Sequence, residues 1–187
     1  MKQKSAIVLI LAITILLSAC TTTDDNSKVE KESDVKQVVL SADYPVYDTA
    51  EDLVGAADFV FSGTVENITY EAIDVSDDGN EQSDVENAIP YTVYEIKVSK
   101  VYQGESTDET VYIKCPGGRI GDTVYVLDSA NPIIKGETYL FLTKTYSNTY
   151  PSLLNVTQAL FNMNTSTISD DGDTITLNDV LAVLEEN

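Results

Sequence analysis

The sequence lacks histidine and tryptophan altogether, and it contains only two cysteines among its 187 residues. Without histidine, the chain cannot form a Ser-His-Asp triad, a Cys-His pair or a His-ligated zinc site. Tryptophan is prominent at binding hot spots, so its absence leaves the 11 tyrosines as the main aromatic side chains for stacking against a ligand. These absences exclude the histidine-dependent classes of hydrolase.

Basic residues are also scarce, with 11 lysines and arginines against 31 aspartates and glutamates and a formal net charge of −20. Binding to nucleic acid depends on cations that neutralise phosphates, so we expect no nucleic-acid partner. An acidic surface favours cationic partners or weakly held Ca²⁺. The apolar content of 43% is enough for a hydrophobic core, which argues against a wholly disordered chain.

The amino terminus has the pattern of a signal peptide. A basic start at Met1–Lys4 precedes an apolar run, Ala6–Leu17, which is shorter than the roughly 20 residues that span a bilayer. The run ends in Leu17-Ser18-Ala19-Cys20, which resembles the lipobox of bacterial lipoproteins. The resemblance implies that residues 1–19 are removed and that Cys20 carries diacylglycerol in an acylated anchor on the extracytoplasmic face of the cell membrane. The alternative is an ordinary secretory signal with a chance cysteine.

Residues 20–43 are rich in Thr, Ser, Asp, Lys and Glu, a composition that cannot bury enough apolar surface to offset chain entropy. We therefore predict a flexible acidic tether between the lipidated Cys20 and a single folded domain at 44–187. The apolar residues Val35, Val38, Val39 and Leu40 are the exception, because they could form a short strand or dock on the domain.

The domain is predicted to begin with a helix. Asp48 is placed as its N-cap, Glu51 stands three positions later, and apolar residues at helical spacing extend it over about Ala50–Ala57. The β-prone segment Phe59–Val65 follows and could continue to Tyr70. Gly63 within it predicts a bulge or a close backbone approach.

Further strands are predicted from alternating apolar residues, with a bulge near Lys100 where the apolar phase shifts. These strands lie over Tyr94–Val98, Val111–Cys115, Gly121–Leu127 and Thr138–Leu142.

The chain is predicted to end in a β-pair between Ala159–Met163 and Thr174–Leu177. A closing helix follows, from Asp179 to about Glu185, with Asn178 as its cap. Its predicted inward face is formed by Val180, Leu181 and Leu184.

Together these elements predict a mainly β domain, a small OB-like barrel of five strands in Greek-key order. It carries a short amino-terminal helix, and a carboxy-terminal hairpin plus closing helix.

Three segments carry a family resemblance, namely Ala57–Val65, Val98–Gly104 and Gly136–Leu142. They resemble a group of bacterial cell-surface lipoproteins of unknown function. More distantly, they are similar to the netrin-like module shared with tissue inhibitors of metalloproteinases, over roughly residues 49–163. The inhibitory role of that module depends on a disulfide-bonded amino-terminal cysteine that reaches a catalytic zinc, whereas Cys20 here is expected to carry lipid.

A candidate Ca²⁺ site lies in the acidic loop Asp74–Asn87. Asp74, Ser76 and Asp78 have the spacing of the first half of an EF-hand loop. The second half departs from that pattern, because Val85 stands where a bidentate Glu belongs, and the alternative is a solvated acidic loop. Ca²⁺ is the one cofactor that the sequence suggests.

Cys115 shares a strand face with Val111 and Ile113, so we predict that it is a small buried hydrophobe. The alternative is a reactive thiol, but no histidine is available to activate it. The next residues, Pro116–Asp122, form a glycine-rich connection containing Arg119, the one arginine of the chain, which could anchor a carboxylate. Tyr146 and Tyr150 are predicted to be exposed on a polar loop.

The function predicted from these features is a non-catalytic, monomeric surface module without catalytic residues. Its loops would bind a peptide, a cell-wall glycan or a partner protein. One alternative is a carboxylate-dependent hydrolase of envelope glycans, because paired Asp and Glu residues can act as acid and base. Another is a protease inhibitor that acts through a loop.

Overall fold

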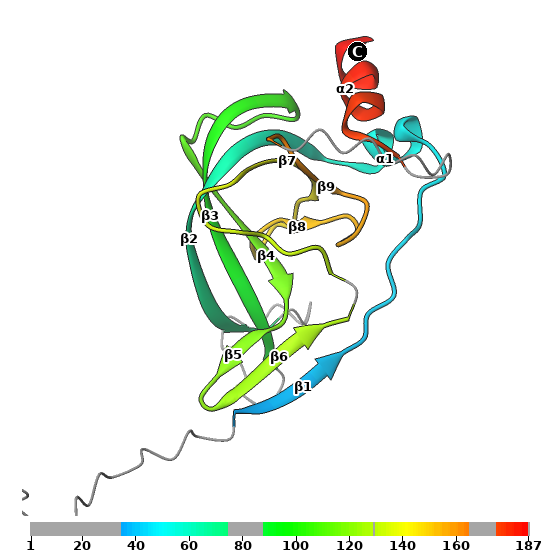
Figure 1. The fold of residues 1–187 in the computed structure, drawn as a ribbon. Coiled ribbons are helices and arrows are strands. Elements are labelled where there is room, and N and C mark those ends of the chain that lie inside the picture. Colours follow the sequence, from blue (N-terminus) through cyan, green and yellow to red (C-terminus); the bar gives the residue numbers. More distant parts are fainter. Residues whose placement is uncertain (1–34, 75–87, 129, 165–174, 187) are drawn as a thin grey trace, which may run out of the picture. The chain divides into compact units, whose positions relative to one another are not determined.

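A computed structural model describes residues 35–74, 88–128, 130–164 and 175–186 (Figure 1). They belong to one compact unit, Ser33–Asn187, while a second unit, Met1–Glu32, lies outside the described residues. The elements in chain order are β1 (Lys36–Leu40), α1 (Ala50–Ala56), β2 (Phe59–Ile73), β3 (Ile89–Gln103), β4 (Thr110–Pro116), β5 (Gly118–Ile120), β6 (Thr123–Leu127), β7 (Thr138–Lys144), β8 (Ser152–Leu153), β9 (Leu160–Asn162) and α2 (Leu177–Glu186).

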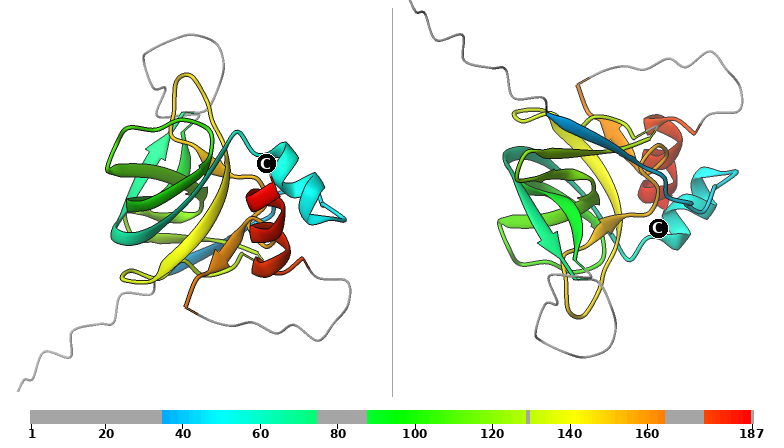
Figure 2. Two further views of the ribbon diagram at one scale, coloured as in Figure 1. Left: turned by 90° about the horizontal axis from the view of Figure 1, so that it is seen from above. Right: turned by 90° about the horizontal axis from the view of Figure 1, so that it is seen from below.

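The main sheet is closed into a ring. Its strands follow the order β2-β3-β4-β8-β7, and β7 also pairs with β2, so no edge of this sheet stays open between them. All pairs in the ring are antiparallel except β4 with β8, which are parallel. This arrangement confirms the predicted five-stranded OB-like barrel (Figure 2).

The long strands β2 and β3 bend around the barrel through irregular pairing. The register shifts where Ser62 is followed by Gly63 and again at Val60, so that Ser99 and Tyr102 of β3 have no direct partner in β2. These positions flank the bulge predicted near Lys100. A Cβ atom on Gly63 would lie 2.6 Å from the Lys97 carbonyl oxygen, so the predicted close backbone approach is also confirmed.

Aromatic residues fill the seam where β2 meets β7. Phe61 and Phe141 are partners in that pairing, both are fully buried, and their ring centroids lie 5.1 Å apart. Phe59 stacks on Phe61 at 4.7 Å. The side chains of Ile96 and Ile113 reach the same core from β3 and β4. Burial of these large aromatic side chains is the main term that stabilises the closure of the sheet into a barrel.

The two helices pack against each other beside the barrel (Figure 2). Leu53 of α1 and Val180 of α2 are fully buried, while Leu181 and Leu184 pack partly buried against the core, as predicted for the inward face. Within the described ranges, no helix is long and apolar enough to cross a lipid bilayer.

Both predicted helix caps are wrong by one or two residues. Thr49, not Asp48, caps α1, because its hydroxyl oxygen accepts a hydrogen bond from the Asp52 backbone N–H at 3.1 Å. At α2, the Asp179 backbone N–H donates to the Thr176 hydroxyl at 3.3 Å, so the capping residue is Thr176, not Asn178. At α2 the Asp179 carboxylate also accepts from the Thr176 backbone N–H at 2.9 Å, which completes a capping box, whereas at α1 the Asp52 carboxylate accepts from the Thr49 hydroxyl instead.

The predicted β-pair between Ala159–Met163 and Thr174–Leu177 is also wrong in its partner. β9 pairs antiparallel with β7 instead, and Ile175 and Thr176 lead directly into α2 without forming a strand. Ile175, just before the helix, and Leu177, its first residue, are partly buried against the core.

A second, three-stranded sheet has the order β1-β6-β5. β1 pairs in parallel with β6 over five residues, Lys36 to Leu40, so the strand alternative for this apolar segment is confirmed. β5 and β6 form a short hairpin that starts at Gly117 and Gly118, both at positive φ. The glycine-rich stretch is therefore a tight strand connection, as predicted.

Candidate functional site

A pocket of about 510 Å³ lies on the side of β4 that faces away from the barrel interior. It is lined by Tyr44, Tyr91, Lys114, Cys115, Pro116, Tyr146, Ser147, Asn148, Thr149, Ser152, Leu153 and Val156. The lining therefore combines β3, β4, the loop that joins β7 to β8 (residues 145–151), and the segment that joins β1 to α1. We call this cavity the tyrosine pocket.

Strand alternation places Lys114 in the tyrosine pocket. Ile113 points into the barrel and is fully buried, so the next residue faces the opposite way. Lys114 is nevertheless only 4% exposed. The outer face of β4 is thus covered at this point, and the covering elements are the walls of the pocket.

The Lys114 ammonium is held by one hydrogen bond and two aromatic rings. It donates to the Thr149 hydroxyl oxygen at 3.1 Å. It also lies 4.6 Å from the ring centroid of Tyr146 and 5.6 Å from that of Tyr91, which are cation–π distances. In the described part of the chain, Lys114 has no carboxylate within ion-pair distance, because the single pair there joins Lys144 to Asp58.

Burial changes the acid–base properties of this lining. It lowers the pKa of Lys114, because desolvation disfavours the charged ammonium. Desolvation raises the pKa of Tyr44 to about 12, with smaller contributions from the nearby Cys115, Tyr91 and Tyr146. The pKa of Tyr91 is raised for the same main reason. At neutral pH, the phenols are therefore neutral hydroxyl groups that can donate and accept hydrogen bonds.

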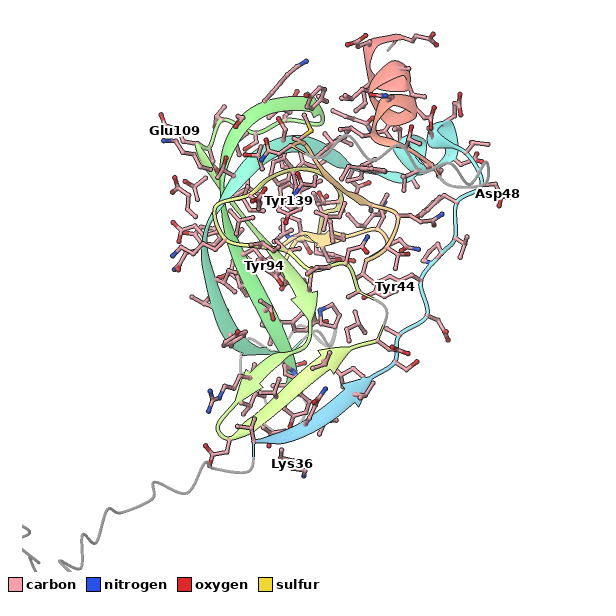
Figure 3. The ribbon with its side chains drawn as sticks, in the orientation of Figure 1. Lys36, Tyr44, Asp48, Tyr94, Glu109 and Tyr139 are labelled. Atoms are coloured by element: carbon pink, nitrogen blue, oxygen red, sulfur yellow. The ribbon has the colours of Figure 1, made fainter. Side chains whose placement is uncertain are left out.

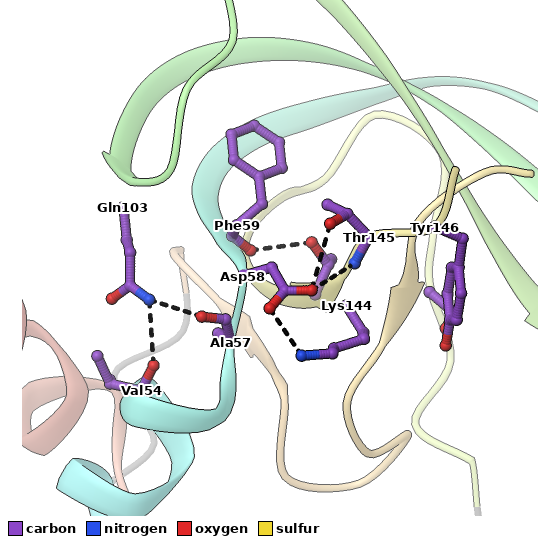
Figure 4. Close-up of polar contacts among 10 residues, drawn as sticks. Val54, Ala57, Asp58, Phe59, Gln103, Lys144, Thr145 and Tyr146 are labelled. Atoms are coloured by element: carbon purple, nitrogen blue, oxygen red, sulfur yellow. Dashed lines mark hydrogen bonds and ion pairs between the residues drawn. The ribbon is translucent and has the colours of Figure 1, made fainter. Parts of the chain in front are cut away.

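Asp58 fixes the start of the 145–151 loop (Figure 4). Its carboxylate accepts from the Lys144 ammonium at 2.7 Å and from the backbone N–H and hydroxyl of Thr145 at 3.1 and 3.2 Å. These bonds hold the residue directly before Tyr146, whose hydroxyl lies 3.1 Å from that of Ser152. Asp58 is consequently a positioning residue for the pocket wall.

The pKa of the Asp58 carboxyl is lowered, chiefly by its hydrogen bond to Lys144. The carboxylate therefore stays ionised under mildly acidic conditions, which preserves its bonds to Lys144 and Thr145 at the start of the loop.

Tyr44 reaches the pocket from the segment between β1 and α1 (Figure 3). Two side chains from the segment between β8 and β9 hold it in place, just after Tyr44. The Asn155 side-chain amide donates to the Pro45 carbonyl at 2.8 Å, and the Gln158 amide bonds both the N–H and the C=O of Tyr47, at 3.0 and 2.9 Å. We call residues 41–47 the strap.

The predicted binding residues do not all meet at this pocket. Tyr146 lines it and is 49% exposed. Tyr150 lies in the same loop, but it is only partly exposed, contrary to the prediction, and its ring is tilted against that of Tyr112 with centroids 5.9 Å apart. Arg119 is on β5, where its Nε donates to the Gly121 carbonyl at 2.9 Å, and it borders a second cavity of about 380 Å³ that shares Cys115 and Pro116 with the tyrosine pocket. The loop prediction therefore applies to Tyr146 but does not unite it with Arg119.

The candidate Ca²⁺ residues are only partly described. Asp74 is the last residue before a gap, while Ser76 and Asp78 lie outside the described residues. Across the ranges that are described, no group of three or more His, Cys, Asp or Glu side chains is arranged to hold a metal ion. The Ca²⁺ site remains a prediction.

The structure describes one of the two cysteines, Cys115, and not the other. Cys20 lies outside the described residues, so its lipidation also remains a prediction. Cys115 packs against the hydrophobic core, and burial raises the pKa of its thiol to about 12. The predicted packing of Cys115 against the core is confirmed, but the residue is only partly buried and also lines the tyrosine pocket, and its raised pKa disfavours the reactive thiolate.

Sequence reasoning missed Tyr44, Tyr91 and Lys114 as site residues. A period-two reading of Val111–Cys115 identifies its apolar face and assigns Lys114 to the opposite face. Such a face is exposed by default, because nothing local indicates that a loop some 35 residues later will cover it. The signal that was available is a lysine flanked by two residues of the core face, on a strand with no acidic neighbour from Thr110 to Pro116.

Comparison with known proteins adds no relative. No model of a known protein family matches this chain, and no curated protein matches it. The functional conclusion therefore depends on the chemistry of the pocket itself.

Proposed function

We propose that the protein is a non-catalytic oligosaccharide-binding module, anchored by lipid on Cys20 to the extracytoplasmic face of the cell membrane. The observation that supports it is the lining of the tyrosine pocket, in which Tyr44, Tyr91 and Tyr146 meet on one face of an OB-like barrel. Barrels of this type commonly bind ligands on the face of their second and third strands, which here are β3 and β4. The faces of tyrosine rings suit the C–H faces of sugar rings.

The polar part of the lining supports a sugar as well. Ser147, Asn148, Thr149 and Ser152 offer hydroxyl and amide groups, which both donate and accept hydrogen bonds as sugar hydroxyls do. A few convergent polar groups in an otherwise apolar pocket are the usual basis of ligand orientation.

A peptide is less well supported as the ligand. Peptides commonly bind barrels and sheets by adding a strand to an open backbone edge. At the pocket, the β4 backbone is paired on both sides, because Lys114 pairs with Val93 and its N–H donates to the Pro151 carbonyl at 2.8 Å. The recognition groups that remain are side chains.

The alternative of glycan hydrolysis draws no support from this site. The twelve described residues that line the tyrosine pocket include neither Asp nor Glu, whereas the usual mechanism requires two carboxyl groups about the scissile bond. Binding without turnover is therefore the function that the pocket chemistry supports best.

The test is an equilibrium binding measurement with a panel of oligosaccharides from bacterial walls and envelopes. We expect at least one of them to bind the full chain, and we expect Tyr91→Ala to weaken that binding by about tenfold, since stacked aromatic groups contribute on the order of 1–3 kcal/mol. Tyr91 is 8% exposed, and its truncation also removes buried packing, so Tyr146→Ala, at a ring that is 49% exposed, is the second variant and should weaken binding as well. Tyr70→Ala is the control matched to Tyr146, because Tyr70 is 55% exposed and does not line this pocket. Equal losses in Tyr146→Ala and Tyr70→Ala, or no binding by any glycan of the panel, would contradict the proposal.

The anchor is tested separately by cell fractionation of Cys20→Ser. We expect the wild-type chain in the membrane fraction and the variant in the soluble fraction, because the thioether bond to diacylglycerol requires the Cys20 thiol. A variant that stays with the membrane as the wild type does would remove the lipid anchor from the proposal and leave the pocket assignment intact.

A further inference from the structure

Lys114 carries a charge that no acidic residue in the described part of the chain balances. The residue is 4% exposed, an ammonium has three N–H donors, and its hydrogen bond within the described chain is the one to Thr149. Removing a cation from water costs free energy unless an anion or several acceptors compensate. Tyrosine rings supply part of that compensation, but they carry no net charge.

The charge contrast between the pocket and the rest of the chain points the same way. The chain carries 31 acidic side chains against 11 basic ones, yet the described lining of the tyrosine pocket has one basic residue and no acidic residue. The one charged side chain in the described lining is therefore positive, on a protein that is otherwise acidic. Such a site is suited to an anionic group.

We propose that the oligosaccharide bound in the tyrosine pocket is acidic, and that a carboxylate on one of its sugars pairs with the Lys114 ammonium. This inference rests on the proposed function and makes it more specific. The rings of Tyr91 and Tyr146, which flank the ammonium, pack against the sugar ring that carries the carboxylate, and Thr149 keeps the ammonium in place. The carboxylate adds the counter-charge that the described chain does not provide.

The pKa direction agrees with this geometry. Burial lowers the pKa of Lys114, and a bound carboxylate would raise it again, so binding of the acid takes up protons at alkaline pH.

The experiment compares two forms of the same ligand on the full chain. Tetragalacturonic acid and a disaccharide that contains muramic acid are each titrated as the free acid and as the methyl ester, which removes the charge and keeps the sugar. For at least one of the two, we expect the free acid to bind about tenfold or more tightly than the ester, because a charge-assisted hydrogen bond is lost with the charge.

Two variants locate the effect. In Lys114→Met we expect acid and ester to bind equally, whereas Lys135→Met should keep the wild-type preference. Lys135 is the control, because it is an exposed lysine that neither lines the pocket nor holds its wall. Loss of the preference in both variants would indicate a general electrostatic effect and would overturn the proposal.

The proposal would also be overturned if the acid and its ester bound the wild-type chain equally, or if neither acid bound. These failures are distinguishable from failure of the proposed function. A neutral oligosaccharide whose binding depends on Tyr91 but not on Lys114 would overturn the acidic ligand and retain the glycan-binding pocket.

Discussion

Ile113 and Lys114, neighbours on opposite faces of β4, are both buried, but for different reasons. On the inner face, Ile113 is surrounded by the barrel core and is fully buried. On the outer face, Lys114 is covered by the 145–151 loop, by Tyr91 and by the strap. Burial on the inner face stabilises the fold, whereas burial on the outer face encloses a charged group in a largely aromatic pocket. Adjacent residues with nearly equal exposure can therefore serve architecture and recognition separately.

The largest expected effect concerns the inner face. Ile113→Ala should lower the free energy of unfolding by about 2–5 kcal/mol, because it removes three methyl or methylene groups and leaves a cavity in a closed core. Urea denaturation of the variant and the wild type measures this difference. The folded fraction should retain its ligand affinity, and a loss of affinity without a loss of stability would break the distinction between the two faces.

The opposite sign is expected on the outer face. Lys114→Met should raise the free energy of unfolding by about 1–2 kcal/mol, since an apolar side chain of similar length replaces a buried cation that has no carboxylate partner among the described residues. The same denaturation experiment measures it, with Lys144→Met as a control that should not gain stability. A clearly destabilised Lys114→Met would mean that the cation–π contacts outweigh the cost of desolvation.

A double-mutant cycle sharpens the outer-face assignment. Thr149→Val should cost about 1 kcal/mol in the wild type, because it removes the described hydrogen bond of a buried ammonium. In the Lys114→Met background, the same change should be close to neutral. Equal costs in both backgrounds would show that Thr149 stabilises the loop independently of Lys114.

A pH titration separates the charge from the shape of Lys114. Its pKa in the folded protein is lower than the ordinary value of 10.5, so the unfolded chain binds more protons between the folded pKa and 10.5. The wild type should consequently gain stability relative to Lys114→Met as the pH rises through that window. The tyrosines with raised pKa values lose stability over a similar range, but both proteins contain them, so their effect cancels in the difference. If the difference in free energy of unfolding between the wild type and Lys114→Met stayed constant up to pH 10.5, the lowered pKa of Lys114 would be contradicted.

The smallest effect is expected from the contacts of Asp58 with Lys144 and Thr145, which hold the start of the 145–151 loop. Asp58→Asn weakens the bonds to Lys144 and Thr145, so Tyr146 should be held less firmly and glycan affinity should fall by about twofold. Lys144→Met keeps the bonds between Asp58 and Thr145 and should leave neutral-glycan affinity unchanged. Calorimetric titration of both variants makes the comparison, and a larger loss in Lys144→Met would assign the positioning to the ion pair instead.

How much of this could be predicted from the sequence depends on how local the cause is. Apolar alternation predicted four strands of the barrel, β2, β3, β4 and β7, and Gly63 predicted the close backbone approach, because side-chain period and the absence of a Cβ act within a few residues. It did not predict the two-residue β8 that closes the ring, and the strand predicted at Gly121–Leu127 belongs to the second sheet as β6. The helix caps were misplaced because Asp48 and Asn178 compete with Thr49 and Thr176, and only the backbone geometry selects between them.

The pocket has a non-local cause, which explains why most of it was not predicted. The loop prediction included Tyr146, since tyrosines in a polar loop are exposed by default. Tyr44 enters the site only because Asn155 and Gln158 fasten the strap more than 100 residues away in the chain. Covering of Lys114 likewise depends on barrel closure through β7 and β8. No local pattern specifies contacts of this range.

The strap has a mechanical consequence. It begins directly after β1, so tension applied to the amino-terminal side of the chain reaches β1 and its pairing with β6 before it reaches Tyr44. While those five residue pairs hold, the strap bears no load. Once they separate, the pull passes to Pro45 and its bond from Asn155, and Tyr44 is withdrawn from the pocket wall. Stretching the chain from its amino-terminal side would therefore release a ligand bound in the pocket, and the short parallel pairing of β1 with β6 sets the force at which this happens.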